Sequence, residues 1–153
     1  MSIEDGGGRP GRDVLSAIAW AENCEREILA RGRVLTPAET ADAVAMGVRA
    51  PQRVRVLVVD AIAAPADGNL QALVHSTGLF SGQLDGLTLG YGIYIVRGRE
   101  TRQLISHECR HVYQCESAGS IAAFIPQYLD QVLSLGYARA PFEIDAYAHE
   151  IRD

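Results

Sequence analysis

Apolar residues recur at helical spacing through the first part of the chain. Between residues 13 and 30 they repeat every three or four positions, which is the pattern of an amphipathic helix, and Gly32 follows as a stop signal. Thr36 and Glu39 then form a capping box around a proline at the first helical position. These signals predict a second helix that ends at about Met46.

Two later stretches carry the residues and the alternation that are typical of strands. Residues 54–59 are mostly β-branched and partly alternating, and residues 87–96 alternate around several glycines. Between the two stretches, the Asp67-Gly68 pair marks a turn. Residues 70–79 fit a short helix.

Helical spacing returns in the last third of the chain. Helices are expected over residues 100–117, 120–135 and 141–151, with glycines closing the first two. The order of elements favours a single α+β domain over residues 13–153, in which a small antiparallel or mixed sheet packs with several helices. Residues 1–12 are rich in glycine and charge and are expected to form a disordered tail.

The composition narrows the class of protein. The chain has 153 residues, 48% of them hydrophobic and 22% charged, and a formal net charge of −5. These values are typical of a globular protein with one domain. The absence of a basic stripe argues against nucleic acid as the main partner. No apolar run is long enough for a membrane span and no signal core is visible, so a cytoplasmic location is expected.

The three cysteines are Cys24, Cys109 and Cys115. An odd number of cysteines without a signal peptide does not suggest a disulfide framework. Their spacing also differs from the paired pattern of a structural zinc site. We therefore interpret them as small buried hydrophobic residues.

Candidate chemistry is concentrated in the helix expected over residues 100–117. His107, Glu108 and His111 form the arrangement His-Glu-x-x-His. On a helix, residues four apart share a face, so the two imidazoles can bind one metal ion while the glutamate reaches a metal-bound water. Zinc bound by two histidines needs a third protein ligand and an open position for water. Glu143, in the first turn of the last expected helix, is well placed in the sequence to supply that ligand.

These segments resemble the gluzincin branch of the zincin metallopeptidases, and are most similar to the small single-domain proteins of that branch. In those proteins the metal helix contains His-Glu-Leu-x-His-Val-x-Gln and a later helix contains Glu-x-Glu/Asp-Ala. The matching segments here are His107-Glu108-Cys109-Arg110-His111-Val112-Tyr113-Gln114 and Glu143-Ile144-Asp145-Ala146. The resemblance covers about residues 87–150, and residues 13–86 carry no assigned motif.

The resemblance implies a zincin-like fold with one Zn²⁺ per chain, bound by His107, His111 and Glu143. It makes Glu108 the catalytic base that activates zinc-bound water. The implied activity is hydrolysis of a peptide or amide carbonyl, with a peptide or protein as the substrate.

Two positions depart from the pattern of this family. Arg110 puts a charge inside a motif that is uncharged at this point in many proteases. Tyr147 stands where larger gluzincins often place an aspartate that orients a ligand histidine. The residue that orients the histidines is therefore not identified by the resemblance. After Glu143, the next candidates for the third ligand are Asp145, His149 and Glu150.

A donor that stabilises the developing oxyanion, or a residue that supports a metal ligand, is also expected. Tyr128, Tyr137, Arg139 and His149 are candidates, because they lie on segments between or beside the ligands. The resemblance also implies that the strand over residues 89–96 forms a sheet edge along the cleft, where an extended peptide can pair with it.

Two other functional classes remain open from the sequence. One is an inactive interaction or scaffold module with a zincin fold, with or without a metal ion. The other is a self-cleaving or toxin-like effector that depends on a partner. The sequence does not decide between zinc and neighbouring divalent metals, and it gives neither the substrate nor the oligomeric state.

Overall fold

The computed structural model describes residues 11–80, 82 and 84–153, which form a mixed α+β fold, as expected. The helices are α1 (Arg12–Arg31), α2 (Pro37–Ala45), α3 (Gly68–Ser76), α4 (Arg102–Ala118), α5 (Ile121–Leu135) and α6 (Pro141–His149). The strands are β1 (Arg33–Val34), β2 (Arg55–Val59), β3 (Gly86–Leu89) and β4 (Gly92–Val96). Every expected helix is present, and its ends lie within about three residues of the expected positions. No described helix is both long and apolar enough to cross a membrane.

The disordered tail expected for residues 1–12 lies almost entirely outside the described residues. At its end the expectation was wrong, because Gly11 is the N-cap of α1 and Arg12 is the first residue of that helix. The Leu15 amide donates a hydrogen bond to the Gly11 carbonyl, so the helical hydrogen bonds begin at this point.

The four strands form one mixed sheet in the order β1-β2-β4-β3. β2 and β4 are parallel, whereas β1 and β3 run antiparallel to their neighbours. The parallel pair arises because the chain passes through α3 and β3 before it returns beside β2. β1 is only two residues long and exposed, and its sequence carries no strand pattern.

The single strand expected over residues 87–96 is instead a hairpin of β3 and β4. Gly90 and Tyr91 form the two-residue turn between the strands. Gly90 has a φ of 69°, and a Cβ at this position would collide with the carboxylate of Glu25 on α1. A glycine with positive φ at the first position of a two-residue turn is typical of a type II′ hairpin. The alternation of apolar residues continues through this turn, so the sequence pattern does not show where β3 ends and β4 begins.

The hairpin changes which strand lies at the edge of the sheet. β4, which precedes α4, pairs on both sides and is an interior strand. The edge strand beside α4 is β3. The edge expected for residues 89–96 is therefore supplied by the preceding strand, and any pairing of an extended peptide would have to involve β3.

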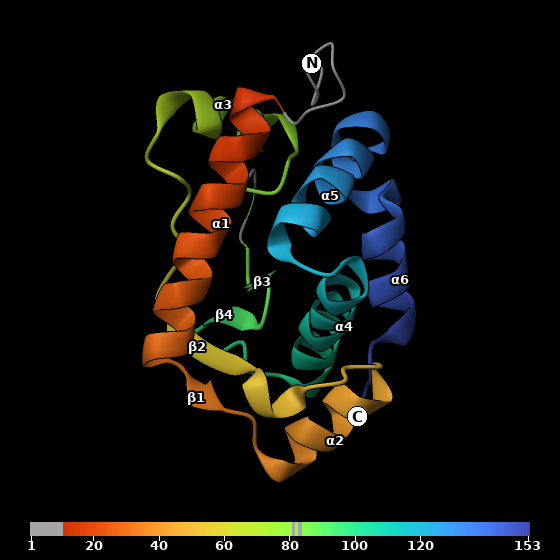
Figure 1. Ribbon diagram of the computed structural model, residues 1–153. Coiled ribbons are helices and arrows are strands. Elements are labelled where there is room, and N and C mark those ends of the chain that lie inside the picture. Colours follow the sequence, from red (N-terminus) through yellow and green to blue (C-terminus); the bar gives the residue numbers. More distant parts are fainter. Residues whose placement is uncertain (1–10, 81, 83) are drawn as a thin grey trace.

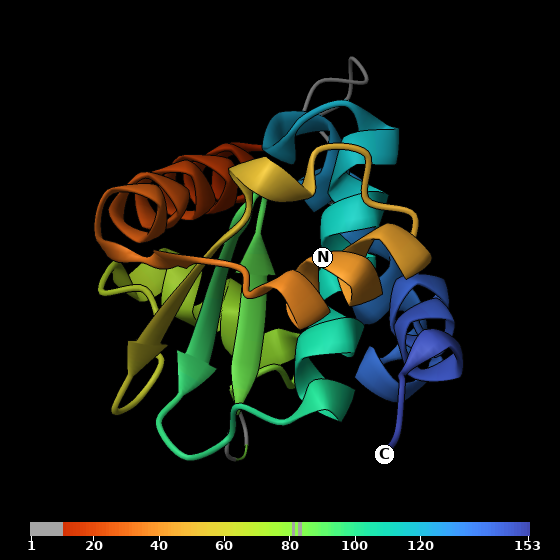
Figure 2. The ribbon, with the colours of Figure 1, turned by 90° about the horizontal axis from the view of Figure 1, so that it is seen from below.

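Helices cover both faces of the sheet (Figure 2). Tyr94 packs in the cluster that contains α1, α3 and α5, whereas Ile93 and Ile95 pack in the cluster that contains α2 and α4. Successive residues of a strand point to opposite faces, so β4 contributes to both cores. α5 and α6 pack beside α4 on the side of the molecule away from β1 (Figure 1).

Local signals in the sequence fix the ends of α4 and α5. The Thr101 side chain accepts a hydrogen bond from the Leu104 amide at the start of α4, and Ser120 accepts one from the Ala123 amide at the start of α5. Gly119, with a φ of 104°, ends α4 and turns the chain into α5. Such a conformation favours glycine because other residues clash there.

The residues after α6 are held against α4. The Ile151 amide donates a hydrogen bond of 2.9 Å to Ser106 Oγ, and Arg102 donates one of 3.2 Å to the Asp153 carboxylate. These bonds keep the segment that follows α6, including Glu150, beside α4.

The interpretation of the cysteines as buried residues is confirmed for Cys109 and Cys115, and holds only in part for Cys24. Cys109 and Cys115 are buried on α4, and burial raises the pKa of both thiols to about 12. Cys24 on α1 is partly buried, and none of the three forms a disulfide.

Candidate metal centre

α4 places His107 and His111 on one buried face, one turn apart. Their Nε2 atoms are 3.2 Å apart, and less than a tenth of either residue is exposed. Ile105, Cys109 and Val112 belong to the core between α4 and the sheet. This packing fixes the rotation of α4 about its axis, and with it the direction of the histidine face.

α6 carries Glu143 to both histidines. His107 Nε2 lies 3.2 Å from Glu143 Oε1, and His111 Nε2 lies 3.3 Å from Glu143 Oε2. One ligand atom from each of the three buried residues lies within 4.8 Å of the other two. The structure thus brings together the three residues expected as ligands, and this group can hold a metal ion.

The second ring nitrogen of each histidine has its own acceptor. His107 Nδ1 lies 2.8 Å from Glu150 Oε2, and His111 Nδ1 lies 2.7 Å from Gln114 Oε1. A carboxylate and an amide oxygen can only accept, so both Nδ1 atoms carry hydrogen and both Nε2 atoms face the shared centre. Metal-binding histidines are usually held in this way. Glu150 is fixed in turn by Gln103, whose Nε2 donates to it at 2.9 Å.

Arg110 and Gln114 join α4 to α6 beside the centre. Gln114 Nε2 donates to the Phe142 carbonyl and to Asp145 Oδ2. Arg110 forms a two-point hydrogen bond with the same Asp145 carboxylate, at 2.8 and 3.2 Å. The positive charge of Arg110 inside the motif is therefore paired with the Asp145 carboxylate on α6. That carboxylate accepts hydrogen bonds from both Arg110 and Gln114. Tyr113 adds a contact, because the Arg110 guanidinium lies 4.2 Å from its ring centre.

Burial and Glu143 act in opposite directions on the two histidines. Burial lowers the pKa of both imidazoles, but the hydrogen bonds to Glu143 and nearby negative charge outweigh it. The pKa of His107 is raised above its ordinary value, and that of His111 is raised to about 9. Burial raises the pKa of Glu143, but its bonds to the histidines are stronger and leave that pKa lowered. A metal ion that binds here must displace protons from the imidazoles.

This electrostatic balance predicts a pH dependence of stability for the chelator-treated protein. The folded-state pKa of His111 is about 9, above the ordinary value of 6.5, so its protonation favours the folded state. This contribution is complete below about pH 6.5 and is lost as the pH rises through about 9. We expect the melting temperature to fall over this window, as followed by circular dichroism with chelator present. The fall should shrink in His111→Gln and persist in His75→Gln, which changes an exposed histidine; an equal fall in all three proteins would contradict the assignment.

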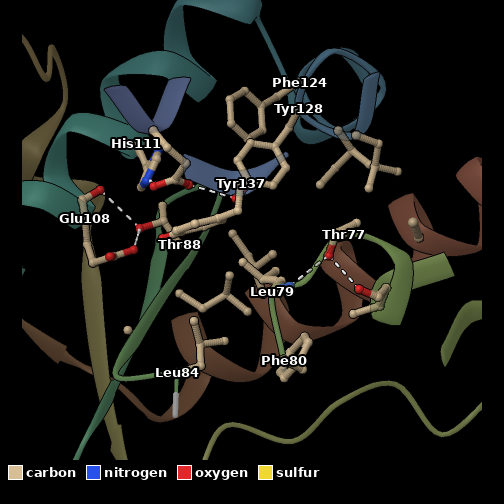
Figure 3. A pocket seen from close by; sticks show the side chains of 18 of the residues that line it. Thr77, Leu79, Phe80, Leu84, Thr88, Glu108, His111, Phe124, Tyr128 and Tyr137 are labelled. Carbon is tan, nitrogen blue, oxygen red and sulfur yellow. Dashed lines mark hydrogen bonds and ion pairs between the residues drawn. The ribbon is translucent and has the colours of Figure 1, made fainter. Parts of the chain in front are cut away.

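Glu108 lies beside the three ligands, next to β3. Its side chain is buried, and its Oε1 is 2.9 Å from the Thr88 hydroxyl (Figure 3). Gly86 packs against it so closely that a Cβ would lie 3.3 Å from the Glu108 carboxyl carbon. Burial raises the pKa of Glu108, although the neighbouring histidines lower it. A carboxylate with a raised pKa is a better proton acceptor near neutral pH than an exposed one.

Two of the tyrosines around the centre were candidates from the sequence. The Tyr128 hydroxyl donates a hydrogen bond of 2.7 Å to Glu143 Oε2, and burial together with that carboxylate raises its pKa. Burial, the Glu143 charge and a hydrogen bond with Tyr147 raise the pKa of Tyr137. Both hydroxyls therefore stay protonated and can donate. Tyr147 itself packs edge-on against His107, with ring centres 4.6 Å apart.

The other two candidates lie away from the centre. Arg139 is exposed, in a short 3₁₀ turn between α5 and α6. His149 is partly exposed, and its Nδ1 bonds to the Asp145 carbonyl at 2.8 Å. Neither residue lines the cavities described next.

Two cavities meet at Glu108 and His107. The first has a free volume of about 80 Å³ and is lined by the three metal-ligand candidates, Glu108 and a large apolar wall (Figure 3). The second has a free volume of about 310 Å³ and also touches Asp85 and Glu150. The centre is therefore buried in the fold and borders the first cavity with all three ligand candidates and the second with His107.

The contact between Glu150 and His107 predicts a loss of metal affinity in Glu150→Ala. Without its acceptor the imidazole is free to rotate and is a weaker ligand, and such partners typically contribute about 10–100-fold to affinity. We expect a change of this size in a competition titration with a zinc chelator. The matched control is Glu22→Ala, which removes an exposed carboxylate from α1 and should leave the affinity unchanged. Equal affinities in both variants would show that Glu150 does not support the site.

Sequence reasoning missed the roles of Glu150 and Thr88. Glu150 was considered only as an alternative ligand, and its actual position depends on how the C-terminal residues pack against α4. Thr88 carried no signal, because its contact with Glu108 exists only once β3 lies beside α4. Gln114 was detectable, since it lies three residues after His111 on the same face of the helix.

Comparisons with known proteins identify no relative of this chain. A scan against protein-family models, a search of curated proteins and a search of solved structures found no match for this chain. The function is therefore inferred from the residues of the centre.

Proposed function

We propose that this protein is a zinc-dependent hydrolase of peptide or amide bonds, similar in its site to the gluzincins. The observation that carries the proposal is the convergence of His107, His111 and Glu143 beside the buried carboxylate of Glu108. The resemblance noted from the sequence supports the same reaction, and the zincin-like fold remains part of the proposal.

The donor set suits zinc. Two histidines and a glutamate form one of the usual ligand sets of catalytic zinc sites. Two nitrogens that each lie 2.0–2.1 Å from a tetrahedral zinc are about 3.3 Å apart. The Nε2 atoms of His107 and His111 are separated by 3.2 Å, so little movement is needed for both to bind one ion.

The chain supplies a proton acceptor next to this centre. When bound, zinc supplies a Lewis acid that polarises a carbonyl and lowers the pKa of a water ligand to about 7. Glu108 accepts the proton of the attacking water and delivers it to the leaving amine. Thr88 holds the Glu108 carboxylate, and Gly86 leaves room for it. Tyr137 lines both cavities and is the donor that we assign to the developing oxyanion.

The proposal is tested by metal content and by metal-dependent cleavage. Tag-free protein, purified without chelator, is analysed by elemental mass spectrometry, and we expect about one zinc per chain. The same preparation is incubated with a broad peptide pool and the products are analysed by mass spectrometry. Cleavage should stop after chelation and return when zinc is restored. One zinc without cleavage would favour the scaffold alternative, and no metal even after incubation with zinc would reject the proposal.

A further inference from the structure

The first cavity has a wall built from segments outside the metal-binding motif. Its residues come from α1, the end of α3 with the segment after it, β3 and α5 (Figure 3). The main apolar contributors are Trp20, Leu79, Phe80, Leu84, Phe124 and Leu129. Leu79, Phe80 and Leu84 lie across the cavity from Phe124 and Tyr128 (Figure 3). We call this cavity the apolar pocket.

Polarity changes sharply along the apolar pocket. All its charged or titratable lining groups lie at the end formed by the metal centre, Glu108 and the two tyrosines. Elsewhere, the Thr77 hydroxyl is already used, because it donates to the Val74 carbonyl and accepts from the Leu79 amide. A charged side chain in the pocket would therefore have no partner among the described residues of its apolar wall. Burying such a charge is strongly unfavourable.

The two cavities beside Glu108 differ in their linings, because apolar side chains dominate the apolar pocket, whereas polar and apolar groups line the second cavity. The free volume of the apolar pocket, about 80 Å³, is several times what one water needs (about 10–15 Å³) and suits a single side chain rather than a whole ligand. The second cavity is larger, about 310 Å³, and carries Asp85, Tyr147 and Glu150. It has room for the polar remainder of a substrate that reaches the same carboxylate.

We propose that the apolar pocket selects substrates that carry an uncharged apolar side chain, of about the size of leucine, next to the bond that is cleaved. This inference rests on the proposed hydrolase function, but the pocket can be tested separately from turnover. Each buried methylene is worth about a fourfold gain in affinity. A leucine has three more carbons than an alanine, so we expect about a 60-fold preference for leucine. Aspartate should be the worst of the three.

Trp20 provides a readout of binding that does not require cleavage. It is the only tryptophan in the chain and it lines the pocket. Acetylated and amidated pentapeptides that differ only in a central Leu, Ala or Asp are titrated into the zinc-loaded Glu108→Gln variant, and Trp20 fluorescence is followed. The same peptides are given to the wild type, and cleavage is measured as kcat/KM. The leucine peptide should bind most tightly and be cleaved fastest.

Ala17→Leu tests the position of the pocket. Ala17 is buried on α1 and lines the pocket, so a leucine there fills part of its volume. Ala19→Leu makes the same change at an exposed position of the same helix and is the matched control. Filling should weaken binding of the leucine peptide at least tenfold, whereas the control should not change it. If Ala17→Leu does not fold, Ile125→Ala enlarges the pocket instead and should shift the preference from leucine to phenylalanine.

The outcomes separate this inference from the proposed function. Tight binding of the leucine peptide that is lost in Ala17→Leu supports the pocket even if no peptide is cleaved. Chelator-sensitive cleavage without preference among the three peptides overturns the pocket and leaves the hydrolase proposal standing. Absence of any fluorescence change, equal binding of the three peptides, or unaltered binding in folded Ala17→Leu also overturns it.

Discussion

Glu108→Gln is expected to reduce peptide hydrolysis by about 10²–10⁴-fold while the zinc content stays at its wild-type level. Glutamine keeps the size of the side chain and an oxygen that can meet the Thr88 hydroxyl, but it cannot accept a proton from the attacking water. Glu108 is not one of the three residues whose ligand atoms converge, so we expect the variant to keep its metal.

The measurement for Glu108→Gln combines kcat on a cleaved peptide with elemental mass spectrometry on the same preparation. Glu22→Gln, at an exposed position of α1, is the control for an unspecific effect of losing a carboxylate. A variant that keeps both its zinc and its activity would remove Glu108 from the mechanism. A variant that loses its zinc would instead place this side chain among the ligands.

The second large effect concerns stability, because metal binding is coupled to folding. An ion present at about 100 times its dissociation constant stabilises the folded state by about 2.7 kcal/mol. In a chain of this size, each kcal/mol corresponds to about 2–4 °C in the melting temperature. The wild type should therefore melt about 5–11 °C higher with zinc than with chelator. In His107→Ala and Glu143→Ala this gap should nearly vanish.

The difference in melting temperature between zinc and chelator, rather than the melting temperature itself, isolates the contribution of the metal ion to stability. His107 and Glu143 also bond to each other, so their replacement lowers stability without any ion. Subtracting the melting temperature with chelator removes that contribution. His75→Ala, on the exposed side of α3, should keep the full gap. A gap that survives in Glu143→Ala would move the third ligand to another residue, with Glu150 first to be tested because it already contacts His107.

Local sequence signals predicted much of the fold. Helix ends are set by residues only a few positions apart, such as the capping box of Thr36 and Glu39 and the glycines after α4 and α5. The observed helix boundaries lie close to these signals. The same holds for the spacing of His107 and His111, because residues four apart on a helix share a face wherever the helix packs. These features need no information about the rest of the chain.

Strand pairing was predictable only in part. The apolar alternation of residues 87–96 continued through Gly90 and Tyr91, so one strand was expected where a hairpin forms. The pattern of alternation reports which residues are buried, but not where the chain reverses. β1 gave no pattern at all, since its two residues are exposed and are positioned by contacts with residues of other elements, through pairing with β2 and the ion pair of Arg33 with Glu39.

The candidate metal centre shows most clearly which features follow from local sequence and which depend on tertiary packing. The sequence by itself determined the motif on α4, its polarity and the choice of Glu143 as the expected third ligand. Only the tertiary structure placed Glu143 beside both histidines and put Glu150 on His107. It also closed one side of the centre with an apolar wall drawn from α1, α3 and α5. These contacts join residues far apart in the sequence, and their geometry is set by the packing of whole helices, which no local pattern encodes.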